Sequence, residues 1–250
     1  MDFTIHKILI EAGDILKEKY RQTQSPYEKQ RWELATETDV EIERLLVERL
    51  RQAFKSDGFI GEECGTQSGG TQRVWIIDPI DGTTNFIMGK PYFSISVALE
   101  ESGEITEGYV YNPISDELYY STKVSGKSFL NEQPISVSQT SEIGQSLVVF
   151  GFSAKMQAIQ QYYQDWQRLF TDCRKGVGWI APALTLCNVA RGRIDVFVDS
   201  GASTFGHSAG AFILKNAGGT LFNYDMADYS HQSIGIVGCA SSMAKVLKGS

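Results

Sequence analysis

The chain has 250 residues, 23 of them lysine or arginine and 30 aspartate or glutamate, which gives a formal net charge of −7. We expect no nucleic acid and no membrane among its partners, because binding to either normally requires a basic surface. Hydrophobic residues make up 42% of the chain, as in ordinary globular proteins. No apolar run approaches the ~18 residues of a transmembrane helix.

The four cysteines, Cys64, Cys173, Cys187 and Cys239, are widely separated and form no CxxC pair. This spacing is typical neither of a zinc site nor of a disulfide framework, so we expect four reduced thiols. Acidic residues are scattered through the first 20 positions, which do not resemble a signal peptide. These features together favour a cytoplasmic location.

Helices and a meander are predicted for the first half of the chain. Apolar residues recur at helical spacing over residues 3–20, and a second helix is predicted to begin at Thr38 or Asp39, either of which could cap it. Predicted strands lie at 74–77, 93–99, 109–111 and 117–121. The first half is therefore expected to be α+β, with N-terminal helices and a mainly antiparallel sheet.

Strands and helices alternate in the second half of the chain. Predicted strands lie at 147–150, 194–198, 220–222 and 234–237, and predicted helices lie at 154–170, 182–190, 208–216 and from 241 onward. This alternation is typical of an α/β layer. We therefore divide the chain near residue 140, into halves of residues 1–140 and 141–250 that pack together with a cleft between them.

The most informative segment is 75–86, Trp-Ile-Ile-Asp-Pro-Ile-Asp-Gly-Thr-Thr-Asn-Phe. A buried strand would end at Asp78, and Pro79 would force a turn because it lacks a backbone donor. Asp81 follows three residues after Asp78, so the turn can aim both carboxylates at one point, where they repel each other unless a cation lies between them. Hard oxygen ligands, including a backbone carbonyl such as that of Ile80, suit Mg²⁺.

The next three residues, Gly82-Thr83-Thr84, allow backbone amides to turn toward the same point. A helix that starts there would offer an anion site. A cation site beside an anion cradle describes a centre for phosphate esters. The alternative is a turn whose carboxylates only cap backbone amides, which would be favoured for Asp-Pro or Asp-Gly alone but not for the whole segment 78–85.

Two more acidic segments lie upstream. In Gly61-Glu62-Glu63, an apolar strand end is followed by two acids, one of which could reach the same centre, although such a pair is more often a solvated loop. Asp39 lies at a predicted helix start, where an aspartate is more often an N-cap than a functional group.

These segments together resemble the inositol monophosphatase family, within the lithium-sensitive, Mg²⁺-dependent phosphomonoesterase superfamily. The resemblance is carried by Thr38-Asp39, by Gly61-Glu62-Glu63 and by 75–86, which matches the family signature without a change. Segments 187–195 and 217–219 also fit, so the resemblance covers roughly residues 35–240. It implies a layered αβαβα sugar-phosphatase-type fold with the metal site at the junction of the two halves, and it implies a homodimer.

The resemblance also implies two or three Mg²⁺ ions. Glu62, Asp78 and the carbonyl of Ile80 would hold the first ion. Asp78 and Asp81 would hold the second, and Glu62 would help to hold a third, weaker one. The implied reaction is in-line hydrolysis of a small phosphate monoester by metal-activated water, without a phosphoenzyme.

Further roles come from the same resemblance. The implied catalytic residues are Glu62, Thr83 and Asp39, where Thr83 orients the attacking water with support from Asp39. The amides of Gly82 and Thr83 would grip the phosphate. Asp199 stands where the family places an acidic residue that contacts substrate hydroxyls.

The chain departs from the family at two places. By spacing from the flanking motifs, the Asp that ligates the second metal falls on Gly206, so the second ion would be held weakly. The family's Gly-Ser/Thr-Ala-Ala stretch, which lines the substrate pocket, is replaced by 180–183, with Ala181 at the hydroxyl position and Trp179 adding bulk. His207 is a conceivable replacement ligand, but imidazole suits Mg²⁺ poorly and a structural role is favoured.

Two hypotheses about function follow. The first is an active Mg²⁺-dependent phosphatase, whose substrate could be an inositol monophosphate, a sugar phosphate or a 3′-phosphorylated nucleotide. The second is a catalytically degenerate family member that acts as a ligand-binding or regulatory protein. The family's lithium sensitivity depends on the altered second site, so it is less firmly implied than the Mg²⁺ dependence.

Overall fold

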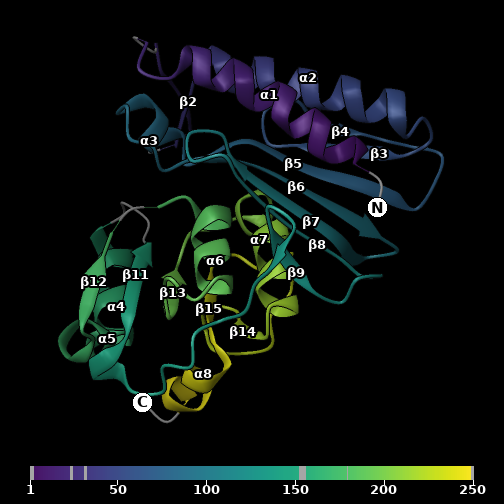
Figure 1. The fold of residues 1–250 in the computed structure, drawn as a ribbon. Helices are drawn as coiled ribbons and strands as arrows, with labels where there is room; N and C mark the ends of the chain where they lie inside the picture. The colour runs from purple at the N-terminus through teal and green to yellow at the C-terminus, as the bar shows by residue number, and fades with distance from the viewer. Residues whose placement is uncertain (1–2, 23–24, 31–32, 152–155, 179, 249–250) are drawn as a thin grey trace.

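The computed structural model describes residues 3–22, 25–30, 33–151, 156–178 and 180–248. Its elements form five stacked layers, in which two helices cover an eight-stranded sheet, two further helices lie beneath that sheet, and a five-stranded sheet with its own outer helices completes the stack (Figure 1). The predicted αβαβα layering is therefore confirmed.

The first layer consists of α1 (Thr4–Lys19) and α2 (Glu37–Ala53). The N-cap of α2 is Thr36, so the prediction of Thr38 or Asp39 as the cap was wrong. Thr36 has the extended backbone that a cap needs, its hydroxyl accepts a hydrogen bond from Thr38 N (3.2 Å), and the Asp39 carboxylate accepts one from Thr36 N (2.8 Å). The two residues form a reciprocal capping box.

The eight-stranded sheet has the order β10-β9-β8-β7-β6-β5-β3-β4 and is antiparallel except where β3 runs parallel to β5. Its strands are β3 (Gly58–Gly61), β4 (Gly65–Gln67), β5 (Arg73–Asp81), β6 (Ser94–Glu101), β7 (Glu104–Asn112), β8 (Glu117–Thr122), β9 (Ser128–Leu130) and β10 (Gln133–Pro134). A separate hairpin pairs β1 (Tyr27–Gln30) with β2 (Glu33–Ala35). The predicted meander is confirmed, with longer strands than the apolar runs indicated.

The five-stranded sheet has the order β12-β11-β13-β15-β14 and mixes parallel and antiparallel pairs. Its strands are β11 (Leu147–Gly151), β12 (Lys175–Val177), β13 (Val196–Asp199), β14 (Gly219–Phe222) and β15 (Ile236–Ala240). The last strand of the first sheet ends at Pro134 and this sheet begins at Leu147. The division of the chain near residue 140 stays a prediction.

The remaining helices flank the two sheets. They are α3 (Thr83–Ile87), the 3₁₀ turn η1 (Ile143–Gln145), α4 (Met156–Asp165), α5 (Gln167–Asp172), α6 (Pro182–Ala190), α7 (Thr204–Asn216) and α8 (Ser241–Lys248). The helix predicted over 154–170 is two helices that break at Trp166, and residues 154 and 155 lie outside the described residues. Helix α7 begins at Thr204 rather than at the predicted 208. Phe205 is the one large apolar residue of its first turn, so no apolar periodicity marks this turn in the sequence.

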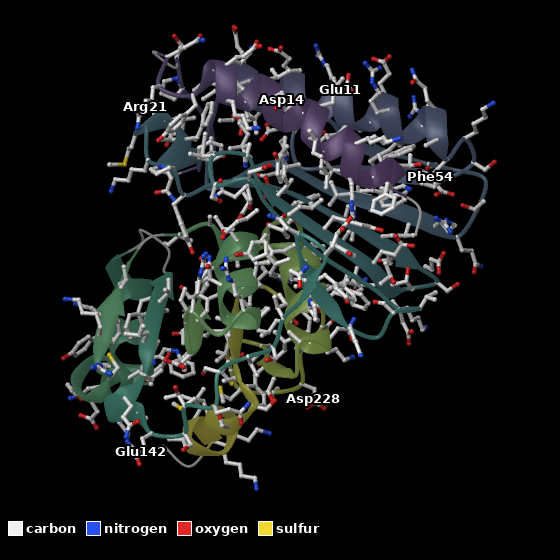
Figure 2. All side chains as sticks on the ribbon, viewed as in Figure 1. Glu11, Asp14, Arg21, Phe54, Glu142 and Asp228 are labelled. Atoms are coloured by element: carbon white, nitrogen blue, oxygen red, sulfur yellow. The ribbon has the colours of Figure 1, made fainter. Side chains whose placement is uncertain are left out.

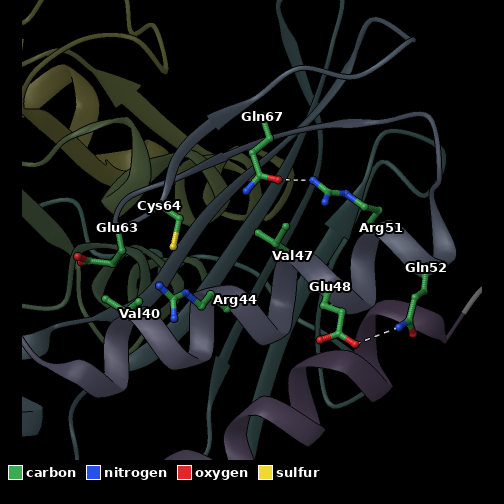
Figure 3. A pocket seen from close by; sticks show the side chains of 9 residues that line it. All are labelled: Val40, Arg44, Val47, Glu48, Arg51, Gln52, Glu63, Cys64 and Gln67. Atoms are coloured by element: carbon green, nitrogen blue, oxygen red, sulfur yellow. Dashed lines mark hydrogen bonds between the residues drawn. The ribbon is translucent and has the colours of Figure 1, made fainter.

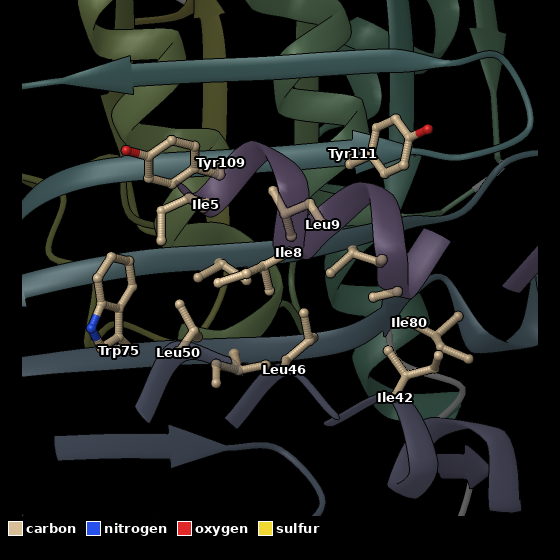
Figure 4. Close-up of a cluster of buried hydrophobic side chains, with 14 of the residues drawn as sticks. Ile5, Ile8, Leu9, Ile42, Leu46, Leu50, Trp75, Ile80, Tyr109 and Tyr111 are labelled. Atoms are coloured by element: carbon tan, nitrogen blue, oxygen red, sulfur yellow. The ribbon is translucent and has the colours of Figure 1, made fainter. Parts of the chain in front are cut away.

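Three clusters of buried hydrophobic side chains lie between the layers. The first lies between the helical layer of α1 and α2 and the eight-stranded sheet, and includes Leu9, Leu46 and Trp75 (Figure 4). The second fills the space around α6 and α7, and the third packs α4, α5 and α8 against the outer face of the five-stranded sheet. Charged residues such as Glu11 and Asp14 project from the outer side of α1 (Figure 2). Among the described residues, no helix is long and apolar enough to cross a membrane.

Candidate active site

The turn after β5 brings the central segment of the sequence to the edge of the eight-stranded sheet. The pairing of β5 with β6 is irregular between Asp78 and Asp81, and Asp78 Oδ1 accepts a hydrogen bond from Ile80 N (3.1 Å). Gly82 follows with a φ of +92°, a conformation that favours glycine, and α3 starts at the next residue. The sharp turn thus leads directly from the two aspartates into the amides of Gly82 and Thr83.

The parallel pairing of β3 with β5 places Glu62 beside this turn. Gly61 is in register with Ile77, and Glu62 N donates a hydrogen bond to Ile77 O (3.2 Å). Parallel strands run toward the same edge of a sheet, so Glu62, which follows β3, and Asp78, near the end of β5, lie at the same edge. Glu62 is exposed, whereas Asp78 is buried.

Helix α2 contributes Asp39 from the other side. Asp39 Oδ1 lies 3.1 Å from Thr83 Oγ1, which is also 2.9 Å from Ile80 O. Its Oδ2 accepts hydrogen bonds from Thr36 N (2.8 Å) and from Thr36 Oγ1 (2.6 Å). Asp39 is therefore both the acidic partner of Thr36 in the capping box and in contact with Thr83, and its functional role stays a prediction.

The three aspartates at this edge have raised pKa values, through burial and through neighbouring acidic charge. Burial, followed by the charges of Glu62, Asp81 and Asp39, raises the pKa of Asp78 well above its ordinary value. Burial raises the pKa of Asp81 to about 7, and burial also raises the pKa of Asp39. In the described part of the chain, no lysine or arginine forms an ion pair with any of these three aspartates. Concentrated negative charge on oxygen donors suits a divalent cation.

Asp81 makes contacts that sequence reasoning did not foresee. Its Oδ1 accepts a hydrogen bond from Ala183 N (3.2 Å), and its Oδ2 accepts from Leu184 N (3.0 Å) and from Ser94 Oγ (2.7 Å). Helix α6 has no capping side chain of its own, because Ala181 is its N-cap. Asp81 therefore caps α6 from the other half of the chain.

These contacts bear on the fit of a metal. Among the described residues, no three acidic, histidine or cysteine side chains already converge as a finished metal-binding group. Glu62, Asp78 and the Ile80 carbonyl are oxygen donors that fit a first Mg²⁺ by their chemistry. Asp81 is already engaged by two amides and a hydroxyl, so it fits a second ion less readily.

Gly206 lies buried in the first turns of α7 and faces the start of α6. A Cβ added there would lie 3.5 Å from Pro182 Cγ and 3.6 Å from Pro182 Cβ, so the position adjoins the residues that contact Asp81. Its match to the family's metal-ligating aspartate stays a prediction.

His207 does not take the place of that ligand. Its Nδ1 lies 2.9 Å from Tyr229 Oη and its Nε2 lies 2.9 Å from Ser233 O. Burial lowers the pKa of His207 to about 4, so the ring is neutral near pH 7. It is a structural histidine that joins α7 to the loop before β15.

The two predicted substrate residues differ in their surroundings. Ala181 is fully buried, and a Cβ on Gly82 would lie only 2.9 Å from Ala181 Cβ, so Ala181 adjoins the turn of the predicted phosphate cradle. Asp199 ends β13 and its Oδ1 accepts hydrogen bonds from Gly201 N (2.7 Å) and Ala202 N (3.0 Å). It therefore closes its own turn instead of contacting Asp39, Asp78 or Asp81. Trp179 lies outside the described residues.

Sequence reasoning missed two residues that organise the site. Asn85 Nδ2 donates to Tyr92 O (2.8 Å) and to Ile180 O (3.0 Å), which ties the turn to the segment before α6. Glu43 is fully buried on α2 and binds the loop that carries Glu62. The signal for Glu43 was present, because an acid one helical turn after Asp39 interrupts the apolar face of α2.

Comparison with known proteins adds three kinds of similarity. The model of the "Inositol monophosphatase family" matches residues 1–249. Inositol monophosphatase 3 of Solanum lycopersicum is 37% identical over 85% of this chain and 81% of its own, and Nus factor SuhB of Xylella fastidiosa is 30% identical over 87% and 79%. Among solved structures, the extragenic suppressor protein SuhB of Bartonella henselae has a TM-score of 0.93 at 26% identity, over 98% of this chain and 96% of its own. The IMPase of Thermotoga maritima has a TM-score of 0.87 at 28% identity, over 97% and 94%.

Proposed function

Because the chain belongs to the inositol monophosphatase family, we propose that it is a Mg²⁺-dependent hydrolase of a small phosphate monoester. The observation that carries the proposal is the acidic edge of the eight-stranded sheet, where Glu62, Asp78 and Asp81 adjoin the Gly82 turn. Burial, together with neighbouring acidic charge, raises the pKa of Asp78 and of Asp81, and carboxylates perturbed in this way are typical of a functional site.

The metal would be held by oxygen ligands of this chain. A first Mg²⁺ would be held by Glu62, Asp78 and the carbonyl of Ile80. A second ion would be held by Asp78 and Asp81. Glu62 would help to hold a third ion, which would bind more weakly. When bound, Mg²⁺ would neutralise the carboxylates, stabilise the charge of the phosphate and increase the nucleophilicity of water. Asp81 would have to share its oxygens with the amides of α6, which is a reason to expect weak second-site binding.

The remaining steps fall to side chains and amides around the turn. The Thr83 hydroxyl would orient the attacking water, while Asp39, already hydrogen-bonded to Thr36, would accept the hydrogen bond of Thr83 and keep it aligned. The amides of Gly82 and Thr83 would hold the phosphate for in-line attack. The reaction needs no phosphoenzyme under this scheme.

The leaving group would be selected by the second half of the chain. Ala181 adjoins the phosphate cradle, and Asp199 would contact substrate hydroxyls if its turn opened. An inositol monophosphate is the substrate class that the family suggests. Because Ala181 offers no hydroxyl and Pro182 no N–H, a sugar phosphate or a 3′-phosphorylated nucleotide is an alternative.

Phosphate release from a panel of phosphomonoesters, titrated with Mg²⁺, tests the proposal. We expect saturable release for one substrate class and its loss, by about 10³-fold or more, in Asp78→Asn. The matched control is Asp14→Asn, on the exposed side of α1, which we expect to be as active as the wild type (Figure 2). Turnover retained in Asp78→Asn would contradict the proposal.

A second candidate function is favoured by Gly206 and by the engaged state of Asp81. With no carboxylate at 206 and with Asp81 capping α6, the chain could bind a ligand or regulate a partner without turnover. Several relatives are named Nus factor SuhB rather than phosphatase. Background release from the whole panel at every Mg²⁺ concentration, with at most one strong Mg²⁺ per chain by calorimetry, would favour this function.

Homodimer formation, the cytoplasmic location, lithium sensitivity and the exclusion of nucleic acid as a partner all stay predictions. Each has its own simple measurement, namely solution mass, fractionation, inhibition and a binding assay. None of them decides between the two candidate functions.

A further inference from the structure

A second buried acid lies on α2, one helical turn after Asp39. Glu43 has no exposed surface, although it is an ionisable residue on the buried face of α2. Residues four apart lie on the same face of a helix, so Asp39 and Glu43 point toward the same sheet edge. Buried acids are rare unless hydrogen bonds satisfy their oxygens, so the partners of Glu43 indicate what it is for.

Both oxygens of Glu43 bind backbone amides of the loop between β3 and β4. Oε2 accepts a hydrogen bond from Glu63 N (2.7 Å), and Oε1 accepts one from Cys64 N (2.7 Å). Hydrogen bonds to an ionised acceptor are about twice as strong as neutral ones. The loop they hold begins with Glu62, immediately before the two bonded amides.

The chain has a glycine where this carboxylate meets the loop. A Cβ at Gly61 would overlap the carboxylate of Glu43, so only glycine permits the close approach at that position. Gly61 also pairs with Ile77 on β5, the residue directly before Asp78 in that strand. The carboxylate of Glu43 is thus packed against the backbone of Gly61, which precedes Glu62 and pairs with the strand that carries Asp78.

The outer side of the loop faces the exposed side of α2, where the Cys64 side chain also interacts with Arg44. Glu63 and Cys64 border an open hollow of about 750 Å³ above the exposed side of α2, together with Val40, Arg44 and Gln67 (Figure 3). On the inner side, the short strand β4 pairs with β3 over only three residues. The two bonds to Glu43 therefore anchor the loop to α2 from within.

We propose that Glu43 is a positioning residue, which holds the β3–β4 loop so that Glu62 faces Asp78 in readiness for Mg²⁺. This inference rests on the proposed function, because it assigns Glu62 to the metal site. Glu43 itself touches no reacting atom and acts only through the loop. Outer groups of this kind typically change metal affinity by 10- to 100-fold when they are removed.

The variant that tests the inference is Glu43→Gln, which keeps the shape but must turn an NH₂ group toward one of the two amide donors. We expect Mg²⁺ to bind about tenfold more weakly by calorimetry, and kcat at saturating Mg²⁺ to stay within about threefold of wild type. Amide hydrogen exchange at 63 and 64, measured without metal, should be at least about tenfold faster. Glu48→Gln, the same change on the exposed side of α2, should alter none of these values.

A second pair of variants tests the contact independently of the charge. Gly61→Ala should weaken Mg²⁺ binding strongly in the wild-type background, because the new methyl group collides with the Glu43 carboxylate. In a Glu43→Ala background the same change should have a much smaller effect, so that the two changes are not additive. Additive effects would overturn the proposed contact.

The outcomes separate this inference from the proposed function. If the wild type binds no Mg²⁺ and releases no phosphate, the proposed function fails and the positioning role fails with it. If the wild type binds Mg²⁺ and Glu43→Gln binds it equally well, the function stands and the inference is overturned. A Glu43→Gln protein that melts earlier but keeps its Mg²⁺ affinity also overturns it, because Glu43 would then be merely structural.

Discussion

At the residue scale, the buried aspartates of the site carry more than one contact each. Asp39 completes the cap of α2 and also contacts Thr83, and Asp81 caps α6 while it lies among other acids. Each of these contacts holds a carboxylate where water cannot fully solvate it. The cost of that burial appears as raised pKa values, and it makes the stability of the metal-free protein depend on pH.

The raised pKa of Asp81 predicts a pH-dependent response to Mg²⁺. Burial, with the nearby Glu62 charge, raises this pKa from 3.8 to about 7 in the folded chain. The folded chain then holds the proton more tightly than the unfolded chain does. The contribution of Asp81 to stability is therefore full at low pH and decreases as the pH rises through this window.

Mg²⁺ takes the place of that proton, so it should stabilise the protein more at pH 8 than at pH 5. We expect the Mg²⁺-induced rise in Tm to be larger at pH 8 by about 3 °C or more, which calorimetric melting curves would measure. Asp78→Asn should show little Mg²⁺-induced rise at either pH. Equal rises at both pH values in the wild type would contradict the assignment of these carboxylates to the metal.

At the element scale, α7 packs against α6 through small residues. Gly210 faces the α6 backbone, where a Cβ would lie 2.6 Å from Ala183 O and 3.0 Å from Ala183 Cα. Gly206, one turn earlier, has more room, since its nearest neighbours would be the Pro182 ring atoms at ordinary contact distances. The close contact of α7 with α6 therefore requires a glycine at 210 but not at 206, although both residues lie inside one helix.

This difference predicts opposite effects of the same substitution. Gly206→Ala should raise the free energy of unfolding by about 0.5–1 kcal/mol, because alanine favours the helix and its methyl group meets no obstruction. Gly210→Ala should lower it by about 1–3 kcal/mol, because α6 and α7 must move apart. Urea unfolding of the two variants measures both values, and a destabilised Gly206→Ala would show that its turn of α7 is not free to accept a side chain.

At the scale of the whole molecule, the candidate site lies where the edge of the eight-stranded sheet meets α6 and α7. Asp81 at the end of β5 binds the first amides of α6, and Asn85 binds the segment that precedes it. Gly206 enters from α7 beside the same helix start. The acidic groups all come from the first half of the chain, and the second half contributes amides and apolar groups in return.

A carboxylate on the side of the second half should therefore change the metal stoichiometry. In Gly206→Asp we expect calorimetry to find two strong Mg²⁺ sites per chain instead of one, because the new side chain starts beside the residues that bind Asp81. Gly206→Asn, which has the same shape without the charge, is the matched control. A gain in phosphate release of tenfold or more would favour the degenerate candidate function for the wild type, and an unchanged stoichiometry would remove residue 206 from the site.

The sequence by itself determined the parts of this protein that depend on local backbone chemistry. Segment 75–86 specified a strand that carries Asp78 and a turn into Gly82-Thr83, and with the other motifs it identified the family, but β5 continues to Asp81 instead of ending at Asp78 as predicted. The periodicity of α1 specified that helix, because burial of one face leaves a direct trace in the order of residues, whereas apolar runs indicated the strands of the meander. Boundaries were less exact where small residues open a helix, as at Thr204.

Only the tertiary structure decided which distant groups meet. The bonds of Glu43 to the β3–β4 loop and the capping of α6 by Asp81 join residues that lie far apart in the sequence. Such contacts depend on strand register and on how closely helices approach the sheets, both of which are set by packing of the whole chain. The residue types of the candidate site were therefore encoded locally, whereas their contacts were fixed by the packing of distant segments against one another.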